Sequence, residues 1–136
     1  MNARGFPSTE SMISLHVTRA GAAMVNGIYL PKSPTEIPVG FVKTCDEMGW
    51  ESKRMWERLA VPKENKTWWL KDDDSYIYYN FGDGRWWIDG PDGKGMYVVK
   101  DFEKADKPPE KGWMRLTNMD GPAPEVVVIT EDESEL

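Results

Sequence analysis

The sequence contains a single cysteine, Cys45, and a single histidine, His16. One cysteine can form neither a disulfide within the chain nor a multi-cysteine metal site. We therefore expect an intracellular protein in a reducing compartment, either the cytoplasm or the interior of an organelle. The first ten residues lack the apolar segment of a secretory signal, so we do not expect secretion. A chloroplast location would require a transit peptide that has been removed.

Long apolar runs and an excess of basic residues are also missing. No stretch is apolar over the length that a membrane-spanning helix needs, so we expect no span and at most peripheral membrane contact. Lys and Arg number 17 against 23 Asp and Glu, which gives a net charge of −6. Binding to phosphates requires a basic surface, so the charge argues against a nucleic-acid partner.

The composition favours one folded domain. Of the 136 residues, 40% are hydrophobic and seven are tryptophan, which is enough for one apolar core and too much for a disordered chain. We expect a flexible N-terminal arm at residues 1–10, a single β domain at 11–130 and an acidic, disordered tail at 131–136.

The stretch Tyr76–Tyr97 carries the clearest structural signal. Bulky strand-forming residues at 76–79, 85–88 and 96–99 are separated by two glycine-rich turns, as in a three-stranded meander. Alternation places Tyr76 and Tyr78 on one face and Ile77 and Tyr79 on the other. Both faces then carry aromatic rings, and each must meet a second layer, a partner or a ligand.

Shorter signals complete the fold. We predict further strands at 11–19, 25–30, 39–44, 67–71, 112–117 and 124–130, and a proline-rich loop at 31–38. Residues 46–59 fit a short helix that ends before Pro62, and a strand at 53–60 fits equally well. The predicted fold is all-β, a small antiparallel sandwich or flattened barrel of about seven to nine strands, with one short helix near 50–60.

The residues offer little chemistry. His16 lies on the polar side of the first strand with no nucleophile placed beside it. Cys45 ends a predicted strand before Asp46 and Glu47, whose charges raise the pKa of a thiol, so we expect a half-buried structural cysteine. Six aspartates lie in apparent turns without the spacing of a calcium loop: Asp72, Asp73, Asp74, Asp83, Asp89 and Asp92. We therefore predict no catalytic residue, no metal, no cofactor and no enzymatic activity.

The tryptophans exceed what a core of this size needs. The adjacent pairs Trp68-Trp69 and Trp86-Trp87 point to opposite faces of their strands. An outward indole could anchor a protein partner, for which we select Trp50, Trp56, Trp69 and Trp87. It could instead stack on a sugar, with Trp68 and Trp86 contributing to a platform. A third alternative is that a second sheet, the 45–59 segment or the termini cover these rings.

Several short motifs, in order, resemble an uncharacterised small β module that is common in algal and other protist genomes. The resemblance covers residues 13–129. Two departures stand out, because the 45–66 segment is longer than usual and Gly40 stands where an aromatic residue is common. The matching motifs are Ala20-Gly21, Val25-Asn26-Gly27-Ile28-Tyr29, Pro38-Val39, Tyr78-Tyr79, Trp86-Trp87, Pro108-Pro109, Gly112-Trp113 and Pro122-Ala123-Pro124-Glu125-Val126.

Such modules look like scaffolding or recognition units, often fused to signalling or ubiquitin-ligase domains. The resemblance implies no catalytic motif. It also implies that a stand-alone copy in a photosynthetic lineage would be an accessory subunit of an organellar assembly, for example a plastid membrane complex such as a photosystem. Our first hypothesis is thus a non-enzymatic interaction module with other protein subunits as partners, and the alternative is a carbohydrate-binding module.

Overall fold

A computed structural model describes residues 13–60, 67–101, 106–116 and 121–129. The predicted arm at 1–10 and tail at 131–136 lie outside these residues. The helices are α1 (Val39–Met48) and α2 (Ser52–Ala60), with a short 3-10 turn, η2, at Ala23–Val25. The strands are β1 (Ser14–Thr18), β2 (Gly27–Lys32), β3 (Trp68–Leu70), β4 (Tyr76–Asn80), β5 (Arg85–Asp89), β6 (Gly95–Lys100), β7 (Met114–Arg115) and β8 (Glu125–Ile129).

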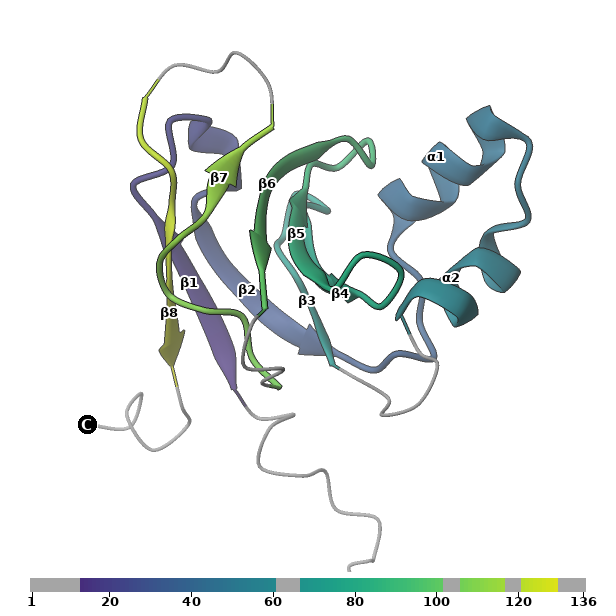
Figure 1. Ribbon diagram of the computed structural model, residues 1–136, viewed down its shortest axis with the longest axis horizontal. Coiled ribbons are helices and arrows are strands. Elements are labelled where there is room, and N and C mark those ends of the chain that lie inside the picture. The colour runs from purple at the N-terminus through teal and green to yellow at the C-terminus, as the bar shows by residue number, and fades with distance from the viewer. Residues whose placement is uncertain (1–12, 61–66, 102–105, 117–120, 130–136) are drawn as a thin grey trace, which may run out of the picture.

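The described strands form one antiparallel sheet in the order β7-β6-β5-β4-β3-β2-β1-β8. The sheet curls into a half-barrel, and the two helices lie together on one side of it (Figure 1). This confirms the predicted all-β flattened barrel with a short helix. Within the described part of the chain, no helix is both long and apolar enough to cross a membrane.

The predicted meander is present. Strand β4 pairs with β5 so that Tyr78 lies opposite Trp87, and β5 pairs in turn with β6. Gly84 and Gly93 have φ values of 71° and 86° in the two connecting turns, a region that glycine enters without steric cost. The local turn chemistry therefore sets the register of the central strands.

The sheet carries an apolar layer on each face. The concave face holds the larger cluster, which includes Leu15, Tyr29, Trp69, Ile77, Tyr79, Trp86, Ile88, Tyr97 and Trp113. The second cluster, which we call the helix-side cluster, consists of Phe41, Cys45, Trp56, Ala60, Trp68, Tyr76 and Tyr78. Alternation along β4 divides its residues between the two clusters as predicted. The second layer required by the outer aromatic rings is thus supplied by α1 and α2.

The strand predicted at 39–44 is wrong, because these residues form the first part of α1. Pro38 occupies the N-cap, and Gly49 ends the helix in the left-handed conformation with φ 77°. Phe41 and Cys45, one turn apart, are buried against the sheet. The 39–44 segment is short and contains β-branched residues, so it resembles a strand, but tertiary packing favours the helix.

Two other predictions on this side are settled. The short helix predicted within 46–59 is present as α2, which spans Ser52–Ala60, while residues 46–48 end α1 and residues 49–51 join the two helices; the competing strand is excluded. The loop predicted at 31–38 begins two residues later, because Pro31 and Lys32 extend β2. Strand β1 pairs with β2 only as far as Tyr29, while Pro31 pairs with Trp69 of β3. Pro31 therefore lies where β2 has only one neighbour, a position that tolerates a missing N–H.

A glycine contact seats α1 on the sheet. A Cβ on Gly40 would lie 2.7 Å from the Gly93 nitrogen and 2.8 Å from the Pro91 oxygen. Both atoms belong to the backbone of the β5–β6 turn, so neither can move aside like the end of a side chain. Gly40, the residue that departs from the resemblance, thus allows the helix to approach this turn closely.

We predict that Gly40→Ala lowers the free energy of unfolding by about 1–3 kcal/mol, because the added methyl group pushes α1 away from the turn. Urea denaturation followed by circular dichroism measures the change. Glu47→Ala, at an exposed position of the same helix, is the control and should leave stability nearly unchanged. Equal midpoints for wild type and Gly40→Ala would show that the close contact does not constrain the helix.

Candidate functional site

The structure places most tryptophans inside. Of the residues selected as contacts, Trp56 and Trp69 are only 2% and 1% exposed, and Trp87 is half-buried. The members of the sugar platform, Trp68 and Trp86, are also buried. Adjacent indoles do point to opposite faces, but both members of the pair Trp68-Trp69 are buried, and so is Trp56 on α2, so the expectation that these rings are exposed is wrong. The helices and the loop before α1 cover them, which is the third alternative weighed above.

That loop also satisfies the buried indoles of the helix-side cluster. The Trp56 Nε1–H donates to the Pro34 carbonyl oxygen at 2.8 Å. The Trp68 Nε1–H donates to the carbonyl oxygens of Ser33 and Glu36 at 2.9 and 3.1 Å. A buried indole N–H without a partner would be costly, so these bonds stabilise the inward positions.

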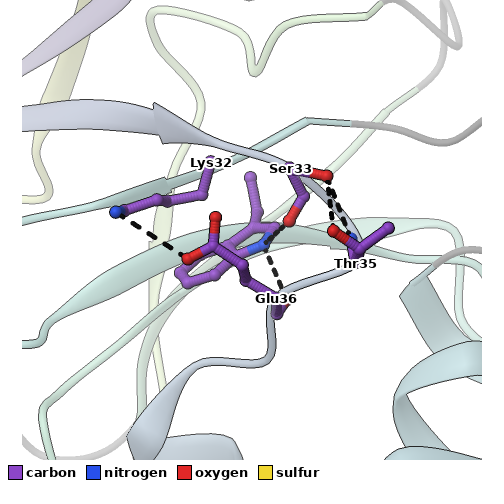
Figure 2. Close-up of polar contacts among 5 residues, drawn as sticks. Lys32, Ser33, Thr35 and Glu36 are labelled. Carbon is purple, nitrogen blue, oxygen red and sulfur yellow. Dashed lines mark hydrogen bonds and ion pairs between the residues drawn. The ribbon is translucent and has the colours of Figure 1, made fainter.

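Polar contacts hold the loop itself in shape. Figure 2 shows the Ser33 hydroxyl bonded to the Thr35 hydroxyl at 2.9 Å, and Lys32 paired with Glu36 at 3.9 Å. The Ser33 hydroxyl also accepts the Thr35 backbone N–H at 3.2 Å. These contacts position the carbonyl groups that receive the two indole N–H groups.

Trp50 differs from the other tryptophans. The remaining indoles donate to partners, Trp69 to the Ile13 carbonyl oxygen and Trp86 to the Asp101 carboxylate among them. Trp50 is the only tryptophan for which the described residues provide no hydrogen-bond partner to the indole N–H. It lies in the short segment that joins α1 to α2 and is 46% exposed. The placement of Trp50 therefore fits a contact residue, unlike that of Trp56 or Trp69.

A cleft opens beside Trp50, between the helices and the outer face of the sheet. Its volume is about 140 Å³. The sheet contributes Tyr76, Tyr78 and Asp89, and the β5–β6 turn contributes Gly93. The helical region contributes Phe41, Thr44, Cys45, Trp50, Met55 and Leu59. We call this space the helix-side cleft.

Asp89 is the unusual group in the cleft. It is 5% exposed, and its Oδ1 has no hydrogen-bond partner among the described residues. The hydroxyl of Tyr76, its neighbour on β4, is likewise buried and has no partner of good geometry in that part of the chain. Burial raises the pKa of Asp89 to about 7, a polar contact with Tyr76 opposes the rise, and the charge of Asp92 adds to it. The cleft thus contains a carboxyl group to whose ionised form the described lining residues offer no positive charge.

The neighbouring groups are kept neutral. Burial, followed by the charge of Asp89, raises the pKa values of the Tyr76 and Tyr78 hydroxyls far above their ordinary range. Burial and then Asp46 raise the pKa of the Cys45 thiol. Cys45 lies on α1, not at a strand end as predicted, and a buried thiol with a raised pKa is a poor nucleophile. The arrangement favours binding over covalent chemistry.

The other candidate residues lie elsewhere. His16 is exposed on β1, the side of the strand that alternation predicts. Asp72 and Asp73 form ion pairs with Lys71 at 3.8 and 3.1 Å, in the turn before β4. Among the described residues, no three His, Cys, Asp or Glu side chains are grouped so that they could hold a metal ion.

A larger cavity of about 870 Å³ lies at the other end of the sheet. Its lining residues come from β6, β7, the 107–112 segment and nearby positions, and they include Arg85, Lys107 and Lys111. Its carboxyl group, Asp101, accepts the Trp86 indole N–H and is therefore already engaged. We take the smaller helix-side cleft as the candidate site because it contains buried polar atoms without partners.

No family model matches this chain, no curated protein matches it, and no solved structure matches it. The resemblance drawn from the sequence motifs therefore stays a prediction. Function has to be inferred from the geometry of the cleft.

Sequence reasoning missed most of the cleft. Asp89 was interpreted as a turn residue, although it follows Arg85 and Trp87 on the outer side of β5. Alternation was therefore a usable signal, since it places Asp89 on the same face as Tyr76 and Tyr78. The part played by Phe41 could not be found, because its segment was predicted to be a strand.

We predict that Asp89→Asn changes how stability depends on pH. The folded state binds the Asp89 proton more tightly than an unfolded chain, in which the pKa is about 3.8. The stability due to this proton is present at low pH and is lost as pH rises to about 7. Between pH 5 and pH 8, the free energy of unfolding of the wild type should fall by about 2–3 kcal/mol relative to Asp89→Asn. Urea titrations at both pH values measure this, and parallel changes in both proteins would contradict it.

Proposed function

We propose that this protein is a non-enzymatic recognition module that binds another protein and serves as an accessory subunit of a larger assembly. In this proposal, one projecting group of the partner enters the helix-side cleft, and Trp50 contacts the surface around that group. The observation that carries the proposal is the combination of an exposed, unbonded indole with a cleft that contains an uncompensated carboxyl group.

The size of the cleft supports insertion of a side chain. Pockets for drug-sized ligands have volumes of roughly 300–1,000 Å³. At about 140 Å³, the helix-side cleft suits a small group that remains attached to a larger molecule. The rim around it supplies Trp50, and tryptophan is enriched among the residues that dominate the energy of protein interfaces.

The surroundings of the reactive residues support a non-enzymatic role. The Cys45 thiol is buried with a raised pKa, and the described structure places His16 on β1, outside the lining of the cleft. Neither residue is paired in the way that nucleophilic catalysis requires. The acidic composition further supports a protein partner over a nucleic acid. A reducing organelle interior, with a plastid membrane complex such as a photosystem as the assembly, is the setting that the sequence resemblance suggests.

The carbohydrate alternative loses its main support. A sugar platform needs a flat, accessible ring, and the rings chosen for it, Trp68 and Trp86, are buried. Trp69, on the concave face, is buried as well. Trp87 is half-buried, and its indole N–H donates to Asp83 at 3.0 Å. We therefore favour a protein partner.

Affinity purification from the native source tests the proposal. We expect Trp50→Ala to reduce recovery of the wild-type partner at least tenfold, because loss of a central tryptophan typically costs 2 kcal/mol or more. Leu30→Ala is the matched control: Leu30 is a 56% exposed apolar residue on β2 that does not line the cleft, so its loss should leave recovery unchanged. Undiminished recovery with Trp50→Ala would exclude this surface as the binding site.

A further inference from the structure

The buried carboxyl group of Asp89 limits what can enter the helix-side cleft. An ionised carboxylate taken out of water is costly unless it is paired and hydrogen-bonded. The titratable groups that interact with Asp89 are Tyr76 and Tyr78 from β4 and Asp92 from the β5–β6 turn, and Cys45 from α1 lines the same cleft. None of them is cationic, and no Lys, Arg or His is among the described residues that line the cleft. The described residues therefore leave the positive charge to be supplied by a bound molecule.

The walls of the cleft suit a particular kind of cation. The Phe41 and Tyr78 rings meet edge to face with centroids 6.1 Å apart, and the Tyr76 and Tyr78 rings lie 5.8 Å apart at an interplanar angle of 33°. Trp50 adds a fourth aromatic ring at the rim. Aromatic faces attract cations through the ring quadrupole, and the attraction grows when the site is desolvated. Aromatic rings around a single carboxyl group form a site for an ammonium ion with an apolar surface.

We propose that the helix-side cleft binds a methylated ammonium group, the side chain of a mono- or dimethylated lysine on the protein partner. This inference rests on the function proposed above and adds the chemistry of the inserted group. The N–H of such an ammonium donates to the Asp89 carboxylate, and its methyl groups contact the aromatic rings that line the cleft. This one ligand matches three features of the cleft: the buried carboxyl group, the aromatic rings that line it and its small volume.

Other small groups match fewer of these features of the cleft. An unmethylated lysine ammonium is strongly hydrated and brings three donors, whereas the cleft offers few acceptors beyond Asp89 and the Tyr76 hydroxyl. A trimethylated ammonium has no N–H left to donate to the Asp89 carboxylate. A neutral apolar group leaves the carboxyl group unpaired, and an anion would face both Asp89 and Asp92. Partial methylation therefore fits best.

Binding should depend on the ionisation of Asp89. The pKa of Asp89 is raised by burial to about 7, so most of the carboxyl is protonated at pH 6 and ionised at pH 8. A cation pairs only with the ionised form, and bound cation in turn favours that form. Affinity for the ammonium group should therefore rise several-fold from pH 6 to pH 8.

Titration of the full chain with short lysine derivatives tests the inference. The probes are N-acetyl-lysine methylamides carrying zero, one, two or three Nε-methyl groups, together with an uncharged analogue in which carbon replaces the nitrogen. Binding is followed by the backbone amide NMR signals of Thr44, Cys45 and Gly93. We expect saturable shifts, with the mono- and dimethyl probes binding at least threefold more tightly than the trimethyl and unmethylated ones. The uncharged analogue should bind at least tenfold more weakly than the dimethyl probe.

Two variants locate the effect. Asp89→Asn keeps the shape of the side chain and should abolish both the preference for charged over uncharged probe and the dependence on pH. Trp50→Leu keeps apolar bulk at the rim, removes the aromatic face and should weaken the dimethyl probe two- to fivefold. Leu30→Ala, away from the cleft, should bind like the wild type. Equal binding of charged and uncharged probes, no saturable shift, or an unchanged preference in Asp89→Asn would each overturn the inference.

The outcomes also separate this inference from the proposed function. If Trp50→Ala abolishes partner recovery while no lysine derivative binds, the cleft recognises a partner through another group and only the lysine assignment fails. If the dimethyl probe binds as expected but Trp50→Ala recovers the partner fully, the assignment of the cleft to that partner fails.

Discussion

The central strands carry large aromatic rings on both faces, and this constraint governs the rest of the structure. A sheet with two apolar faces needs a packed layer on each side. The half-barrel encloses one face by curling, so the rings of Trp69 and Trp86 fill its interior. The other face cannot be enclosed in that way, and the two helices cover it. The loop before α1 then satisfies the buried indole N–H groups of Trp56 and Trp68, so the second layer is fixed by hydrogen bonds as well as by packing.

A gap in the helix layer holds a buried carboxyl group for which the described residues supply no positive charge. Asp89 ends β5 at the edge of the helix-side cluster, where the described residues offer its buried side chain a contact with Tyr76 but no positive charge. Natural structures seldom keep such a group without a use, because a neutral or apolar residue would be more stable there. Burial of Asp89 destabilises the free protein. A ligand that supplies a positive charge relieves this destabilisation, and the relief adds to its binding free energy.

Local signals predicted the central meander because its glycine turns and alternating strands are determined within a few residues. The opposite orientation of the paired tryptophans followed from the same alternation. Their burial did not follow, since alternation defines two faces but not the number of layers that cover them. Helix α1 was missed because its formation depends on a distant contact, that of Gly40 with the β5–β6 turn. The cleft was only partly predictable for the same reasons. Alternation gives the face on which Asp89 lies, but the opposite wall is formed by the helices, which the sequence did not place there.

The strand order has a consequence for biosynthesis. Strand β8 has a single neighbour in the sheet, β1, and pairs with it from Ser14–Ile129 to Thr18–Glu125. One edge of β1, the first described strand, therefore stays unpaired until β8, the last described strand, has left the ribosome. During this time the buried side chains Leu15 and Val17 lack part of their packing, and contacts between such distant segments form slowly. The nascent chain should need protection from aggregation until its closing strand is made.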